Sequence, residues 1–161
     1  MTLPPKRSRM SPVIAEYDGS FLEPVVRLWR ESFEFGVGVT DPHPLSEQLE
    51  YFVSQVLPTN RVSLAFLSSQ LVGFVAASSV SISQLYVRVG LHRQGIGSAL
   101  LASAKAESSG SLWLYTFARN AVACRFYEKH GFIVVGRGFE PEWQLEDVKF
   151  SWSNMGAPVA T

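Results

Sequence analysis

The segment with the clearest chemical meaning is a glycine-rich stretch between two apolar runs. It reads Gly90-Leu-His-Arg-Gln-Gly-Ile-Gly97 and leads into the alanine-rich SALLASAKAESS. Glycines at 95 and 97 let a ligand approach the backbone closely. The start of the following helix offers free N–H groups and the positive end of the helix dipole. The stretch predicts an anion site, most often for phosphate, although a tight turn without a ligand fits a lone Gly-x-Gly equally well.

The spacing of this loop excludes two common nucleotide motifs. A P-loop needs G-x-x-x-x-G-K-[ST], and no Lys-Ser or Lys-Thr follows the glycines. A dinucleotide fingerprint that starts at Gly95 needs Gly or Ala at its sixth position, where this chain has Leu100. The phosphate ligand therefore has to be of another kind.

A second chemical segment follows, Asn120-Ala-Val-Ala-Cys-Arg-Phe-Tyr-Glu-Lys-His-Gly-Phe132. Asn120 can cap a helix and Gly131 can end it. Taken alone, the aromatic pair Phe126 and Tyr127 is more often part of a core than of a reaction. Cys124 has no base near it in the sequence, which favours a packing role over a nucleophilic one.

Taken together, the two segments resemble the GNAT superfamily of N-acetyltransferases. The family's acyl-CoA loop, Q/R-x-x-G-x-G/A, is matched by residues 92–97 except at His92, where Gln or Arg is usual. The family's N-x-x-A-x-x-F-Y-E-x-x-G-F is matched throughout from Asn120 to Phe132. The resemblance covers residues 61–152 well, and the first 60 residues only through the order of their elements.

This resemblance implies direct attack of an amine on the thioester of acetyl-CoA, without an acyl-enzyme. Tyr127 matches the tyrosine that protonates the departing thiolate. The expected acetyl-CoA-binding residues lie on one strand, in the loop and on one helix: Leu85, Tyr86, Val87, Arg93, Gln94, Gly95, Ile96, Gly97, Ser98, Asn120 and Phe126. Backbone groups of the strand would pair with the pantetheine arm, and loop N–H groups would hold the pyrophosphate. For the Arg93 side chain, a charge contact with the phosphates and a plain surface position fit equally well.

The general base is not evident from the sequence. Some family members carry a carboxylate on the strand before the loop, but Ser81-Ile-Ser-Gln-Leu-Tyr-Val87 has none. A water held by Ser83, Gln84 or a backbone carbonyl could serve instead. Four titratable residues of the first helix and its following loop are expected to be surface residues rather than bases: Glu31, Glu34, Asp41 and His43.

The sequence does not identify the acceptor amine either. Residues 30–45 and 136–146 are expected to form its wall, and Glu140, Glu142 and Trp143 would suit a cationic or aromatic-contacting small amine. A peptide N-terminus or a lysine fits as well. Two other functions stay open: a non-catalytic acyl-CoA-binding sensor on the same fold, and an α/β module that binds another nucleotide.

The elements that must position these residues follow from apolar periodicity. Strands are expected at 13–17, 62–67, 71–77, 82–89, 111–117, 132–135 and 148–152. Helices are expected at 21–35, at 46–57 with Ser46 as its cap, after the glycine loop, and at 121–130. The fold class is a mixed α/β sheet of about seven strands flanked by about four helices, and the resemblance adds that the parallel strands 82–88 and 111–117 splay apart. Residues 12–154 form one domain, with loose tails at 1–11 and 155–161.

Composition limits the partners. Fourteen Lys and Arg balance fourteen Asp and Glu, which gives no general electrostatic reason to expect nucleic acid or an anionic membrane. One cysteine and three scattered histidines predict neither an internal disulfide nor a metal site. No apolar run approaches the ~20 residues of a membrane helix, and the basic start lacks the apolar region of a secretory signal. We expect a cytoplasmic protein that could form a homodimer.

Overall fold

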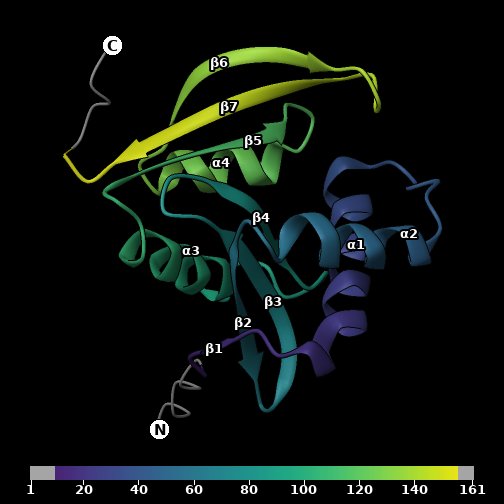
Figure 1. Cartoon of the computed structure of the whole chain (residues 1–161). Helices are drawn as coiled ribbons and strands as arrows, with labels where there is room; N and C mark the ends of the chain where they lie inside the picture. The colour runs from purple at the N-terminus through teal and green to yellow at the C-terminus, as the bar shows by residue number, and fades with distance from the viewer. Residues whose placement is uncertain (1–9, 156–161) are drawn as a thin grey trace, which may run out of the picture.

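A computed structural model describes residues 10–155 as two β-sheets with helices packed on both faces (Figure 1). Nearly all of the two expected tails, 1–9 and 156–161, lies outside these residues. The first sheet has the order β1-β2-β3-β4 and is antiparallel throughout. Its strands are β1 (Val13–Glu16), β2 (Arg61–Leu67), β3 (Gln70–Ala77) and β4 (Ile82–Val87).

The second sheet has the order β5-β7-β6 and is also antiparallel. Its strands are β5 (Ser111–Phe117), β6 (Ile133–Glu140) and β7 (Leu145–Ser153). The sequence predicted shorter strands at 132–135 and 148–152. The apolar pattern stops at Gly136 and Gly138 because the hairpin continues beyond the core, with most β6 residues exposed.

The two sheets meet at a single bridge within the described residues, the parallel pair Ser81 and Trp113. There the Trp113 N–H donates to the Val80 carbonyl at 3.1 Å. Beyond this bridge β4 and β5 run in the same direction without pairing, so a gap opens toward their ends at Val87 and Phe117. The expected fold class with splayed parallel strands is confirmed.

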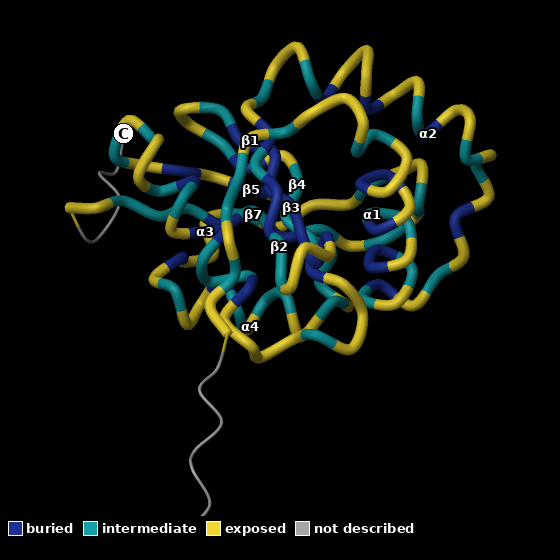
Figure 2. Tube along the Cα trace, turned by 90° about the horizontal axis from the view of Figure 1, so that it is seen from below, coloured by how far each residue is buried: buried dark blue, intermediate teal, exposed yellow. Residues whose placement is uncertain are grey.

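Four α-helices cover the sheets within the described range. Helices α1 (Leu22–Val37) and α2 (Leu45–Tyr51) pack on one side, and α3 (Ile96–Ala106) and α4 (Ala121–Lys129) on the other (Figure 1). Seven of the eight β3 residues are buried, and the buried trace in Figure 2 concentrates in the central strands and on one side of α1. Gly73 lets α3 approach closely, because a Cβ there would lie 3.0 Å from Leu100 and 2.9 Å from the Tyr86 carbonyl.

The first two helices differ from expectation at their ends. A 3₁₀ turn, Gly19–Phe21, precedes α1 and is capped by Asp18, and α1 runs past Phe35 until Gly38 adopts a left-handed φ of 77°. The prediction of Ser46 as the cap of α2 is wrong. Pro44 takes that position, since its carbonyl accepts the first helical hydrogen bond from Gln48. A π-helical turn, Phe52–Val56, continues α2.

None of the helices between residues 10 and 155 has the length and apolar character needed to cross a membrane.

Candidate functional site

The glycine loop ends in the conformation that an anion site requires. Gly95 is the N-cap of α3 and has a φ of 81°, and Arg93 also has a positive φ, 66°. The Ala99 N–H makes the first helical bond, to the Gly95 carbonyl at 3.0 Å. The N–H groups of residues 96–98 precede that bond, so they have no acceptor within the helix and can bind an anion at its N-terminus.

Gly97 also serves the contact between α3 and α4. A Cβ at this position would lie 3.2 Å from the Phe126 ring. The Phe126 ring contacts the rings of Tyr127 and His130, at centroid distances of 5.2 and 4.5 Å. The two sequence motifs therefore meet in space.

Ser98, expected among the phosphate contacts, shares a hydrogen bond with His130. Its Oγ lies 3.1 Å from the His130 Nε2. Burial, and then the charges of Lys105 and Lys129, lower the pKa of His130, so the imidazole is neutral at physiological pH. His130 itself was not singled out from the sequence, where it reads only as a helix-end residue.

The backbone of β4 faces the gap at alternate residues. The Arg88 N–H donates to the Val72 carbonyl at 2.8 Å, and the register pairs Tyr86 with Phe74. In an antiparallel pair this directs the peptide groups of Tyr86 toward β3 and those of Leu85 and Val87 toward the gap. Of the three predicted strand residues, Leu85 thus has both backbone groups directed to the gap, and Val87 offers its N–H, because its carbonyl accepts a hydrogen bond from the Ser32 hydroxyl.

Tyr127 and Tyr86 lie close enough for one side chain to influence the ionisation of the other. The Tyr127 side chain is only 6% exposed and packs against the rings of Phe132 and Phe150. Burial, and secondarily the neighbouring Tyr86, raises the pKa of Tyr127 well above its usual value. Burial also raises the pKa of Tyr86 to about 12. Both phenols therefore keep their protons at physiological pH.

Asn120 caps α4 as the sequence predicted. Its Oδ1 accepts a hydrogen bond from the Ala123 N–H at 3.2 Å. Its amide nitrogen lies against α1, where a Cβ at Gly36 would approach to 2.7 Å. The first helix of the chain is thereby held next to the second motif.

Helix α1 reaches across the open end of the gap. The Ser32 hydroxyl donates to the Val87 carbonyl at 2.8 Å, on the β4 side. The Phe33 ring contacts Phe117 at the end of β5, at 6.1 Å between centroids, and Trp143 at 5.1 Å. Residues 30–45 and 136–146, each expected to form the acceptor wall, are therefore in contact.

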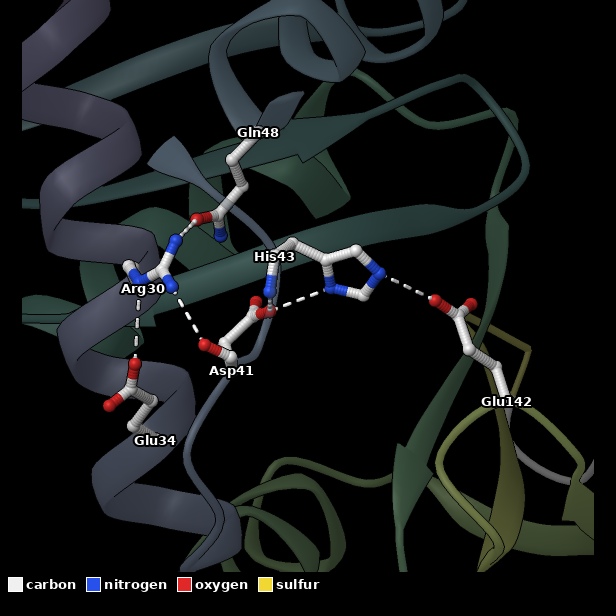
Figure 3. A network of polar contacts seen from close by, with 6 residues as sticks. All are labelled: Arg30, Glu34, Asp41, His43, Gln48 and Glu142. Carbon is white, nitrogen blue, oxygen red and sulfur yellow. Dashed lines mark hydrogen bonds and ion pairs between the residues drawn. The ribbon is translucent and has the colours of Figure 1, made fainter. Parts of the chain in front are cut away.

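A polar network connects the same two segments (Figure 3). The His43 Nδ1 lies 2.7 Å from Asp41 Oδ1, and its Nε2 lies 3.0 Å from Glu142 Oε1. Asp41 was expected at the surface, and this is wrong because the residue is only 7% exposed. Two hydrogen bonds from His43 to its carboxylate and one from Arg30 to its carbonyl compensate for the lost water.

Arg30 and Gln48 complete the network and were missed from the sequence. The Arg30 guanidinium donates to Gln48 Oε1 at 3.0 Å and lies 3.4 Å from Glu34. Gln48 is buried, on the side of α2 that faces α1. The sequence signal for burial of Gln48 was its position four residues before the core residue Phe52, on the same helix face. A single glutamine on an apolar face is weak evidence for a functional role.

The remaining candidates are more isolated. His92 is exposed, with its ring 6.4 Å from that of Phe35, and partial burial lowers the pKa of the imidazole. Gln84 Oε1 is the buried side-chain oxygen or nitrogen that has no hydrogen-bond partner in the described residues. Between residues 10 and 155 no group of three or more His, Cys, Asp and Glu side chains could hold a metal ion.

Comparison with known families and structures adds to this geometry. Residues 58–134 match the family model of the acetyltransferase (GNAT) domain. No curated protein matches the sequence significantly.

Three solved structures illustrate the similarity in fold at low sequence identity. The PaiA N-acetyltransferase of Thermoplasma acidophilum, in complex with coenzyme A, is 22% identical with a TM-score of 0.72, covering 89% of this chain and 99% of that one. YjaB of Escherichia coli is 22% identical with a TM-score of 0.73, covering 92% and 100%. A ribosomal-protein-alanine N-acetyltransferase of Brucella melitensis is 18% identical with a TM-score of 0.67, covering 88% and 99%. At these identities the likeness shows the shared fold.

Proposed function

This chain carries a GNAT acetyltransferase domain, and from that premise we propose that it transfers the acetyl group of acetyl-CoA to a primary amine. The observation that carries the proposal is the unpaired gap between β4 and β5, with the glycine loop beside it and Tyr127 next to it. An extended amide chain can fill such a gap and pair with its edges as a strand would.

Acetyl-CoA fits this site along its length. The pyrophosphate would bind the N–H groups at the start of α3, from Arg93 to Ser98. The pantetheine arm would pair with the gap-facing backbone of Leu85 and Val87, with Asn120 nearby. The Thermoplasma neighbour with this fold was solved with coenzyme A, which supports the same ligand here.

Tyr127 is the proposed general acid. The amine attacks the thioester carbonyl, and the oxyanion that forms accepts hydrogen bonds from gap-facing N–H groups of β4. As the C–S bond breaks, Tyr127 gives its proton to the sulfur and regains one from the acetylated nitrogen. Burial makes Tyr127 a weak acid, but a thiolate released into the same apolar surroundings is a correspondingly stronger base.

An acetylation assay against an amine panel tests this proposal. The panel contains polyamines, amino acids, aminoglycosides and peptides, and free coenzyme A is measured as product. Transfer to at least one class, with thermal stabilisation by coenzyme A but not by ATP or NAD, is the expected result. Stabilisation by ATP or NAD instead would point to another nucleotide and overturn the assignment.

A second function is favoured by one observation. Strand β4 has no carboxylate, and Gln84 stands in it with an unpartnered carbonyl oxygen. An acyl-CoA sensor without catalysis would need no base there. Tight binding of acetyl-CoA with no transfer to any amine of the panel would favour the sensor over the enzyme.

A further inference from the structure

The polar network of Figure 3 connects α1 and the loop after it with α2 and with the turn between β6 and β7. The glycine loop belongs to the α3 side of the gap, and α1 crosses the open end on the other side through Ser32 and Phe33. Trp143 packs on Phe33, and His43 packs on Trp143 at 5.8 Å between ring centroids. These contacts place His43 and the turn of the β6–β7 hairpin on the α1 side of the gap, away from the glycine loop.

Asp41 fixes the orientation of the His43 ring. One carboxylate oxygen accepts both the His43 backbone N–H, at 2.9 Å, and the Nδ1–H, at 2.7 Å. Arg30 holds the Asp41 carbonyl at 2.7 Å and is itself held by Gln48. With Nδ1 donating to a buried carboxylate, Nε2 is the ring atom that gains and loses a proton.

Glu142 faces that Nε2 atom from the opposite segment. The two atoms are 3.0 Å apart, and the Glu142 side chain is mostly exposed at the hairpin turn. An alkylammonium carries the same charge as a protonated imidazole and also donates hydrogen bonds. An incoming ammonium can therefore take over the Glu142 carboxylate and leave a neutral His43 beside it.

We propose that Glu142 binds the acceptor as an ammonium ion and that His43, positioned by Asp41, accepts its proton. This inference rests on the proposed acetyl transfer and names the acceptor class: primary amines that are cationic in water. The neighbouring rings of Phe33 and Trp143 would contact the carbon skeleton of such an amine.

The proton steps balance. The ammonium gives one proton to His43 Nε2, and the free amine attacks the thioester carbonyl. The C–N bond forms, the C–S bond breaks, and the second proton of the nitrogen reaches the sulfur through Tyr127. His43 then releases its proton to water, so that ammonium and acetyl-CoA become amide, coenzyme A and one proton.

This assignment predicts a pH dependence with a definite sign. The hydrogen bond to Asp41 raises the pKa of His43 above its usual value, and the charges of Asp41, Glu142 and Glu47 add to it while burial opposes them. Arg30 is the cation that faces the network from α1. Because only neutral His43 can accept a proton, and the raised pKa belongs to the enzyme without bound amine, kcat/KM should rise with pH through a midpoint above about 6.5.

The test measures kcat and KM against pH with the best amine of the panel. In His43→Gln the rise in activity with pH near that midpoint should disappear, and kcat should fall about 10²–10⁴-fold. Asp41→Asn removes the main cause of the raised pKa, so its midpoint should move to lower pH. Glu142→Gln should raise KM for the ammonium at least tenfold. Glu107→Gln, an exposed residue at the C-terminal end of α3 that pairs with Arg61 outside the expected acceptor wall, is the control and should behave as wild type.

Melting temperature and coenzyme A affinity show whether each variant is folded and loaded. If His43→Gln keeps the same rise in activity with pH, His43 is not the base. If Glu142→Gln keeps the KM of wild type, Glu142 does not bind the ammonium. If wild type transfers acetyl to no amine, the proposed acetyl transfer fails. Calorimetry of amine binding then tests the role of Glu142 separately. Equal amine binding to coenzyme A-loaded wild type and Glu142→Gln, or none to wild type, would show that Glu142 does not bind the ammonium.

Discussion

At the scale of single residues, Tyr127 has two roles that one substitution can separate. Its ring fills the core between Phe132 and Phe150, and its hydroxyl is the proposed acid. Tyr127→Phe keeps the ring, so folding and coenzyme A affinity should be nearly intact. We expect kcat to fall about 10²–10⁴-fold with little change in KM, because the proton is shared mainly in the transition state.

Measurement of Tm and kcat on the same Tyr127→Phe preparation separates the two roles. A purely structural tyrosine predicts a lower Tm and normal turnover. That result would remove Tyr127 from the mechanism.

His92 departs from the family's loop pattern but should matter little. Its ring is exposed beside Phe35, while the phosphates are assigned to main-chain groups of the loop. We expect His92→Ala to change the Kd for coenzyme A by less than about tenfold, or ~1.4 kcal/mol, in a calorimetric titration. A much larger loss would show that the imidazole itself holds the ligand.

At the scale of elements, the contact between α3 and α4 depends on the missing side chain of Gly97. A methyl group there would meet the Phe126 ring at 3.2 Å. Gly97→Ala should therefore lower the free energy of unfolding by about 1–3 kcal/mol and weaken coenzyme A binding, since the packed Phe126 ring must give way.

The double variant Gly97→Ala with Phe126→Leu tests the cause. The smaller side chain makes room, so the two substitutions should cost less together than the sum of their separate effects in urea unfolding. Strict additivity would mean that the glycine is needed for the loop conformation alone.

The sequence predicted the elements well where a periodic run of apolar residues ended at a clear turn or capping residue. The order of strands, the loop, and the helix from Asn120 to Gly131 follow from such signals and are found as expected. It found β6 and β7 but made both too short, because the part of the hairpin beyond the core has no buried face to enforce a period. It failed for Asp41, whose burial depends on Arg30 and His43, contacts that a pattern along the chain cannot show.

At the scale of the whole molecule, coenzyme A should behave as a structural part of the fold. A ligand at a concentration 100-fold above its Kd stabilises the native state by about 2.7 kcal/mol. For a chain of this size that corresponds to a rise in Tm of roughly 5–10 °C. Hydrogen exchange should slow most at the gap-facing amides of β4 and β5, because a ligand between the sheets covers both edges.

Differential scanning calorimetry and amide exchange with and without coenzyme A check this together. Protection confined to the start of α3 would mean that the pyrophosphate binds but the arm does not enter the gap.

The single bridge between Ser81 and Trp113 has a consequence for the protein without its ligand. Past that pair, β4 and β5 each have an edge that pairs with no other strand of the described residues, although the Val87 carbonyl of β4 accepts a hydrogen bond from Ser32. Unpaired edges of this kind are templates for the strands of other chains. If the proposed function holds, acyl-CoA would complete the sheet as an added strand, and its supply would thus govern how long the molecule stays monodisperse.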